Sequence, residues 1–76
     1  MGAGMGIPTR NLDLNFTPDR VKAIRIGLGL TQEDFGQKLG VEGKIVSRWE
    51  RGQTTPTRGP VLKALLDAEA EAEASV

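Results

Sequence analysis

The chain has 76 residues and a mass of 8.1 kDa, which is enough for one small domain and no second one. It contains neither cysteine nor histidine, which excludes disulfide frameworks, zinc–thiolate sites, imidazole bases and cysteine nucleophiles. No apolar run approaches the roughly 18 residues of a membrane span. The N-terminus also lacks a basic region followed by an apolar stretch, so we expect a cytoplasmic protein with no membrane partner.

The formal net charge of zero hides an uneven distribution. Residues 17–66 hold nine basic and five acidic residues, a surplus of four positive charges, whereas the last ten residues hold four acids and no base. A basic body with an acidic tail is compatible with an anionic partner such as nucleic acid. A solvated surface gives the same count, so the charge alone favours nucleic acid only slightly.

Residues 1–16 are expected to form a flexible or extended arm, because the first ten are rich in glycine and have no periodic pattern. Leu12, Leu14 and Phe16 alternate with polar residues, which is the pattern of a short strand. Such a segment either packs in an extended form on its own domain or pairs with a second chain. The sequence leaves both alternatives open.

Two helices are predicted in the first half of the body. The first begins with Thr17 as its N-cap, followed by proline at the first helical position, and ends near Leu28. The second begins with Thr31 as its N-cap and ends at Gly40, which suits the left-handed conformation of a helix C-cap. The second helix has only about two turns, so it requires tertiary packing to persist.

Two further helices are predicted in the second half. The third runs from about Glu42 to Arg51, and turn-forming residues follow it. The last begins near residues 58–60, since proline is tolerated only in the first turn of a helix. Residues 68–76 are expected to be a frayed acidic tail that folding does not need, because their acids lie at the negative end of the helix. The domain is therefore expected to span residues 17–67.

Large apolar residues recur at helical spacing and predict one buried core. Trp49 is expected inside it, because Val46 lies three residues earlier on the same helix face. The pattern predicts an all-α domain of four, or at most five, helices. The predicted core residues are Val21, Ile24, Leu28, Phe35, Leu39, Val41, Val46, Trp49, Val61 and Leu65.

The second and third helices are short and are joined by a glycine-containing turn, which is the pattern of a helix-turn-helix. Gly36 is expected where these helices approach closely, since a large side chain there would push them apart. The stretch from Ile24 to Leu66 resembles the phage repressor and Cro-like (XRE) helix-turn-helix family, whose fold is lambda-repressor-like. The continuation from Pro56 is also similar to compact antitoxin-type members. The matching segments are Leu30–Phe35, Leu39–Val41 and Val46–Gly52.

The resemblance implies that the third helix enters the major groove of DNA while the second crosses the phosphate backbone. Arg48 is the best candidate for a guanine reader, because its side chain can bond O6 and N7 together. Ile45 could touch a thymine methyl or simply pack locally. Lys44 and Arg48 could also be ordinary solvated charges. The resemblance also implies a structural ion pair between Arg25 and Glu50. The residues implied for base readout are Gly43, Lys44, Ser47 and Arg48, and those implied for the DNA backbone are Thr31, Gln32, Lys38, Ile45, Arg51 and Arg58.

No catalytic residue, metal ligand or cofactor site is predicted, and we do not expect an enzyme. Glu33 and Asp34 are explained by the electrostatics of a helix start, and the glycines form no phosphate-binding loop. The sequence predicts a prokaryotic or phage transcription regulator that binds double-stranded DNA sequence-specifically and acts as a homodimer on a palindromic operator. The alternative is an antitoxin-like module whose main partner is a toxin and whose DNA binding is secondary.

Overall fold

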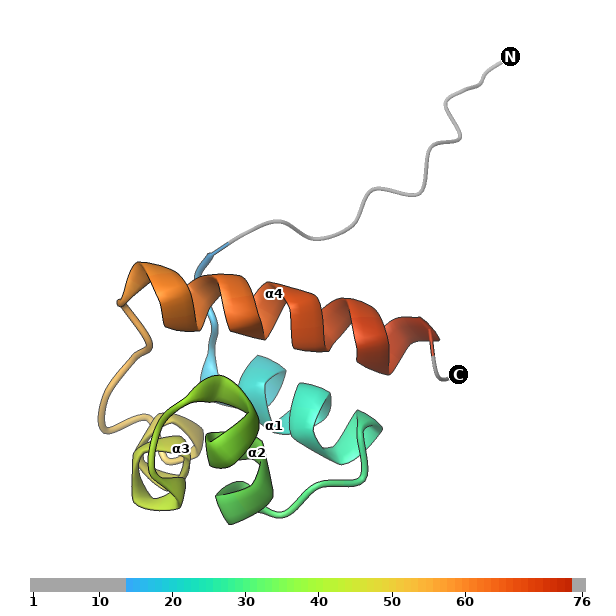
Figure 1. Cartoon of the computed structure of the whole chain (residues 1–76). Helices are drawn as coiled ribbons and strands as arrows, with labels where there is room; N and C mark the ends of the chain where they lie inside the picture. The colour runs from blue at the N-terminus through green and yellow to red at the C-terminus, as the bar shows by residue number, and fades with distance from the viewer. Residues whose placement is uncertain (1–13, 75–76) are drawn as a thin grey trace.

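The computed structural model describes residues 14–74, and within this range it contains four helices and no strand (Figure 1). The three shorter helices lie together beneath α4, which extends across α1 and α2. This arrangement confirms the all-α class and the predicted order of elements. The helices are α1 (Pro18–Gly27), α2 (Gln32–Leu39), α3 (Gly43–Glu50) and α4 (Gly59–Ala74). Of these helices, none has the length and apolar character needed to cross a membrane.

The starts of α1 and α2 are held by side-chain caps. The Thr17 hydroxyl oxygen accepts a hydrogen bond from the Arg20 backbone N–H at 3.2 Å, and the Thr31 oxygen accepts one from Asp34 at 3.0 Å. Each bond satisfies a backbone donor that has no partner within the helix. Gly40 ends α2 with φ of 81°, in the left-handed region that favours glycine. The local sequence therefore sets these three boundaries.

Backbone approaches backbone where α2 meets α3. A β-carbon added at Gly36 would lie 2.6 Å from the carbonyl oxygen of Val41, and one added at Gly43 would lie 2.9 Å from Cα of Glu33. Both separations are shorter than a β-carbon tolerates, so the two glycines allow the helices to pack against each other without intervening side chains. The predicted close approach at Gly36 is present, and Gly43 provides a second one.

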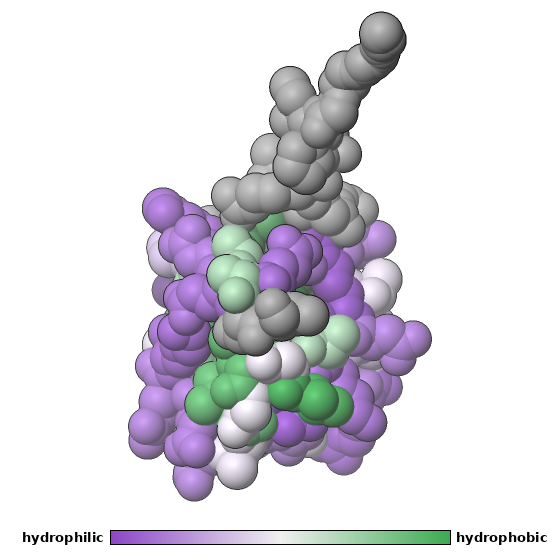
Figure 2. Space-filling model, turned by 90° about the vertical axis from the view of Figure 1, so that its right-hand side faces the viewer, coloured by the Kyte–Doolittle hydropathy of each residue, from purple (hydrophilic) through white to green (hydrophobic). Residues whose placement is uncertain are grey.

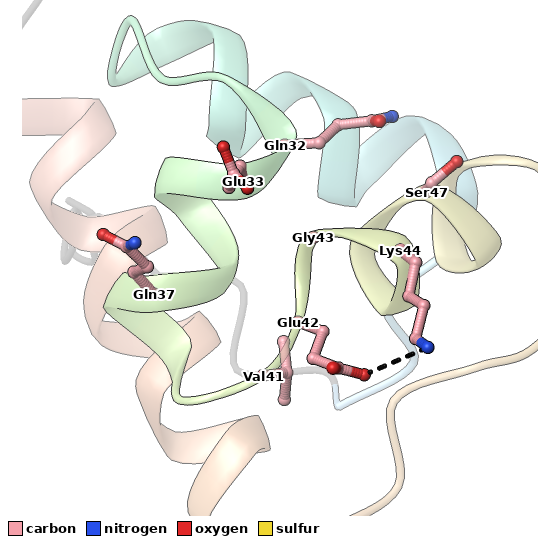
Figure 3. Close-up of a pocket in the computed structure, with 8 residues that line it drawn as sticks. All are labelled: Gln32, Glu33, Gln37, Val41, Glu42, Gly43, Lys44 and Ser47. Carbon is pink, nitrogen blue, oxygen red and sulfur yellow. Dashed lines mark ion pairs between the residues drawn. The ribbon is translucent and has the colours of Figure 1, made fainter.

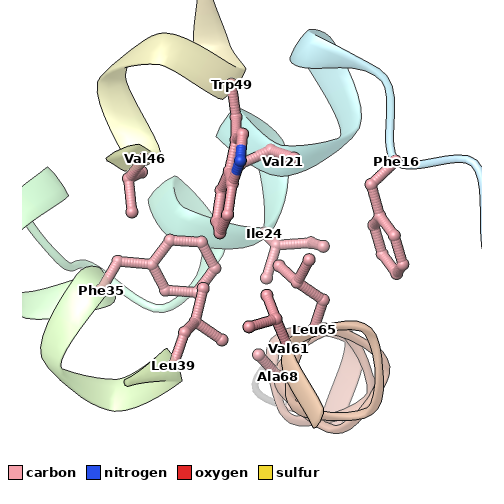
Figure 4. Packing of buried hydrophobic residues seen from close by; sticks show 10 residues of the cluster. All are labelled: Phe16, Val21, Ile24, Phe35, Leu39, Val46, Trp49, Val61, Leu65 and Ala68. Carbon is pink, nitrogen blue, oxygen red and sulfur yellow. The ribbon is translucent and has the colours of Figure 1, made fainter. Parts of the chain in front are cut away.

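The core lies where all four helices converge (Figure 4). Trp49 extends from α3 into the centre of the cluster, where the ring of Phe35 and the side chain of Ile24 point toward it. Eight of the ten predicted core residues are buried, and the other two, Leu28 and Val41, are partly buried at its edge. The buried residues are Phe16, Val21, Ile24, Phe35, Leu39, Val46, Trp49, Val61, Leu65 and Ala68.

Phe16 was assigned to the arm, but it belongs to the core and is only 1% exposed. Phe16 directly precedes the N-cap of α1, and Val21 is the fourth residue of that helix. Both are buried, which is the arrangement of a hydrophobic staple. The Arg20 guanidinium lies over the Phe16 ring, 4.0 Å from its centre, and closes this side of the core. Leu14 is half exposed, and the described part of this segment forms no strand. Leu12 lies outside the described residues.

The expectation of a frayed tail after Asp67 is wrong, because α4 continues to Ala74. Ala68 is completely buried in the core. Glu69 accepts two hydrogen bonds at 2.8 Å from the Arg20 guanidinium, and Glu71 pairs with Lys38 of α2 at 2.9 Å. The repulsion between these acids and the negative helix end is therefore offset by basic residues of α1 and α2. Periodicity alone could not show these distant partners.

The pair between Arg20 and Glu69 predicts that the end of α4 contributes to stability. Both side chains are largely buried, so Glu69→Ala removes two charge-assisted hydrogen bonds and should lower the free energy of unfolding by about 1–3 kcal/mol. Glu73→Ala, which removes an exposed acid from the same helix, should change it by less than about 0.5 kcal/mol. Urea denaturation of both variants measures the difference, and equal effects would contradict the proposed role of the pair.

Candidate nucleic-acid interface

A polar network joins the ends of three helices beside the core. The Arg25 guanidinium donates to both carboxylate oxygens of Glu50, at 2.7 and 3.1 Å, so the expected ion pair is present. Arg25 also donates to the carbonyl oxygen of Leu30 at 3.0 Å, and the Gln32 amide donates to Glu50 at 3.2 Å. The network therefore connects α1, the turn before α2, the start of α2 and the end of α3. It holds the orientation of α3 relative to α2.

The network changes the acidity of both charged partners. Hydrogen bonding to Glu50 raises the pKa of Arg25, against the opposing effect of burial. Burial by itself would raise the pKa of Glu50, but the hydrogen bonds from Arg25 and Gln32, together with the charges of Arg25 and Lys22, lower it below its ordinary value. The carboxylate is therefore held in its charged form.

This lowered pKa predicts an acid-sensitive stability. A carboxylate whose pKa is lower in the folded state stabilises the fold above its unfolded pKa of about 4.3, and this contribution is lost as the pH falls through the folded value. Glu50→Gln should be less stable than the wild type at pH 7, and its stability should fall less steeply from about pH 5 downward. Thermal unfolding between pH 7 and pH 3 measures how the stability of each protein changes with pH. Parallel curves for the wild type and Glu50→Gln would contradict a lowered pKa of Glu50.

A shallow hollow lies between the N-terminal ends of α2 and α3 (Figure 3). Gln32 and Glu33 lie on its α2 side, and Lys44 and Ser47 lie on its α3 side. Glu42 is the N-cap residue of α3, but its side chain makes no capping hydrogen bond. Its carboxylate instead pairs with Lys44, with 3.5 Å between Oε1 and Nζ. Polar groups, together with charged groups of both signs, therefore line this surface.

The structure brings most of the residues predicted for base readout to one face of α3. Lys44 and Arg48 are exposed four residues apart, which places them on the same side of the helix, and Ser47 lies half-buried in the hollow. Gly43 differs from the prediction, because the direction a side chain would take leads into the backbone of α2 at Glu33. We therefore assign Gly43 to helix packing rather than to base readout.

The residues predicted for the DNA backbone divide into two groups. Thr31, Arg51 and Arg58 are exposed, and the two arginines form no ion pair within residues 14–74. Gln32 is at the start of α2, where backbone N–H groups face outward, although its amide is engaged with Glu50.

The remaining two residues of this set have other roles in the structure. Lys38 lies at the C-terminal end of α2 and is paired with Glu71 of α4. Ile45 is half-buried against the core, beside Trp49, which agrees with the alternative of local packing. The structure thus brings the N-terminal end of α2 and the outer face of α3 together, while Lys38 contacts α4.

From the sequence, Glu42 is expected at the start of the third helix and has no further predicted role. It is a poor N-cap, since its side chain is longer than those of the favoured cap residues. The pattern that the sequence offers at this position is an acid that is a poor helix cap and lies two residues before a lysine.

Among the described residues, no group of three or more acidic side chains is placed to hold a metal ion.

The short α2, the glycine-containing turn and the exposed face of α3 define a helix-turn-helix DNA-binding domain. The family model HTH_3, helix-turn-helix, matches residues 21–68, and the chain belongs to this family. It is also similar to the Type II methyltransferase M.SsoII of Shigella sonnei, with 42% identity over 50 residues. That match covers 62% of this chain and 13% of the methyltransferase, so this chain corresponds to a small part of that protein. No solved structure matches the chain.

Proposed function

We propose that the chain is a prokaryotic or phage regulator that binds specific DNA sequences in the cytoplasm, as a homodimer on a palindromic operator. The observation that supports this most directly is the outer face of α3, where Lys44 and Arg48 are exposed on one side beside the start of α2. The Arg25–Glu50 network and the two glycine contacts hold that face in position. Methyltransferase activity is not proposed, because the similarity to that enzyme covers only 13% of it.

In this proposal α3 enters the major groove with its N-terminal end first. Arg48 bonds O6 and N7 of one guanine, and Ser47 makes a short polar contact nearby. The outward backbone N–H groups at the start of α2 and the Thr31 hydroxyl bind a phosphate. Arg51 and Arg58, on either side of the turn between α3 and α4, contribute further phosphate contacts.

Dimer formation supplies the affinity that one short recognition helix lacks. Two domains related by a two-fold axis place two copies of α3 about 34 Å apart, which is one turn of DNA, and so require a palindromic site. Val61 and Leu65 are buried in the core, whereas Leu62 and Leu66 remain half-buried on α4. We therefore propose the surface around these two leucines as the interface.

Arg48→Ala tests the recognition face. It should weaken binding to the preferred duplex by about 1–3 kcal/mol and relax specificity at one base pair in each half-site. Lys63→Ala, which removes an exposed lysine paired with Asp67 on α4, is the matched control and should leave base preference unchanged. Fluorescence anisotropy across a salt series measures both, with log K falling by about 0.9 per phosphate contact for each decade of salt. Absent or salt-independent binding would favour the antitoxin-like alternative.

Leu62→Glu tests the proposed interface. A charged side chain at a half-buried apolar contact should give a folded monomer that binds operator DNA without cooperativity. Ile26→Glu is the control, because Ile26 is 59% exposed at the end of α1. Figure 2 shows an apolar area amid hydrophilic residues on the face that bears the C-terminal ends of α1 and α4. Sedimentation velocity decides between the α4 surface and the surface around Ile26. If only Ile26→Glu dissociates the dimer, the interface lies around Ile26. A monomeric wild type would contradict the dimer.

A further inference from the structure

We propose that Glu42 and Lys44 act as a unit that reads one C·G base pair in each half-site. The Glu42 carboxylate accepts a hydrogen bond from N4 of cytosine, and the Lys44 ammonium donates to O6 of the paired guanine. This inference rests on the proposed function, since it requires that α3 enters the major groove. It assigns base selection to an acidic residue, in a domain whose other proposed DNA contacts are basic or neutral.

The position of Glu42 provides the first argument. It lies at the N-terminal end of α3, the end that enters the groove first, and its side chain is 71% exposed. Because the carboxylate makes no capping bond to the helix, it is not committed to holding the fold together. A negative charge here is repelled by every phosphate, so its presence favours DNA only where a base offers it a hydrogen-bond donor.

The spacing of the two charged groups provides the second argument. The carboxylate oxygen and the ammonium nitrogen are 3.5 Å apart and lie side by side at the hollow (Figure 3). In a C·G pair, N4 of cytosine donates to O6 of guanine, so these two atoms lie about 2.9 Å apart. Both are exposed in the major groove, where N4 keeps one free N–H and O6 keeps one lone pair. The acceptor and donor of the protein therefore match the donor and acceptor of one base pair.

The chemistry of the groove distinguishes C·G from A·T. Adenine also offers a donor at N6, but its N7 acceptor lies beside that donor and repels a carboxylate. Thymine offers a single acceptor next to its methyl group, whereas guanine offers O6 and N7 together to a lysine. Both halves of the protein pair therefore favour C·G, with the cytosine facing Glu42.

Gly43 fixes the position of the turn that carries the two charged side chains. It lies between Glu42 and Lys44 in the sequence. The direction of its absent β-carbon leads to the backbone of Glu33, so the first turn of α3 is seated directly on α2. The glycine that permits this close packing therefore seats the turn that carries both the carboxylate and the ammonium.

The test is a binding selection from random DNA duplexes with the wild type, Glu42→Gln and Glu33→Gln. Wild-type protein should select a C·G pair at one position of each half-site. Glu42→Gln should lose that preference about tenfold and shift toward A·T, because an amide bonds N6 and N7 of adenine together. It should also bind non-specific DNA more tightly, since a negative charge has been removed. Glu33→Gln removes an exposed acid from the same hollow and should keep the wild-type preference.

Chemical modification of the selected site provides an independent measurement. Replacing the selected cytosine by N4-methylcytosine removes the free N–H, so it should weaken the wild type about tenfold and leave Glu42→Ala unaffected. If the wild type selects a site that Glu42→Gln recognises with the same base preference, the proposed pair is overturned while DNA recognition stands. If the wild type selects no sequence at all, both the pair and the proposed function fail.

Discussion

The structure depends on the direct approach of the α2 and α3 backbones. At Gly36 and at Gly43 there is no room for a β-carbon against Val41 and Glu33, so two short helices of eight residues each lie in contact along their facing sides. Neither helix has the length to be stable alone. Their mutual contact and the core beneath it supply the stability that the helix propensity of such short segments does not. The exposed face of α3 is presented in one orientation because of this constraint.

The Arg25–Glu50 network adds orientation to that contact. A largely buried ion pair is weak evidence for net stability, because removing two charges from water is costly. Here the guanidinium and the Gln32 amide satisfy the carboxylate oxygens, and Leu30 supplies a further acceptor. The network therefore specifies how the ends of α1, α2 and α3 meet. A change in that geometry would tilt the surface that carries Lys44 and Arg48.

The neutral net charge conceals a separation of charges that suits a DNA-binding domain. Three of the four acids of α4 are paired within the chain, Asp67 with Lys63, Glu69 with Arg20 and Glu71 with Lys38. These pairs use three basic residues that lie on helices other than α3. Of the other exposed basic residues, Lys22 lies on α1, and four gather on α3 and on the turn that follows it, namely Lys44, Arg48, Arg51 and Arg58. The local field, rather than the total charge, determines the attraction to phosphate.

The sequence by itself determined the starts of the helices, the ends of α1, α2 and α3, most of the core and the family, because caps, glycines and apolar spacing are local signals. Thr17, Thr31 and Gly40 act through bonds or dihedral angles within a few residues of themselves. Only the tertiary structure decided the roles of Glu69 and Lys38, because their partners lie far away in the chain, and only it showed that Phe16 is buried in the core. It likewise turned Gly43 from a base reader into a packing residue and placed the Glu42 carboxylate beside Lys44, since both depend on how α3 is seated against α2.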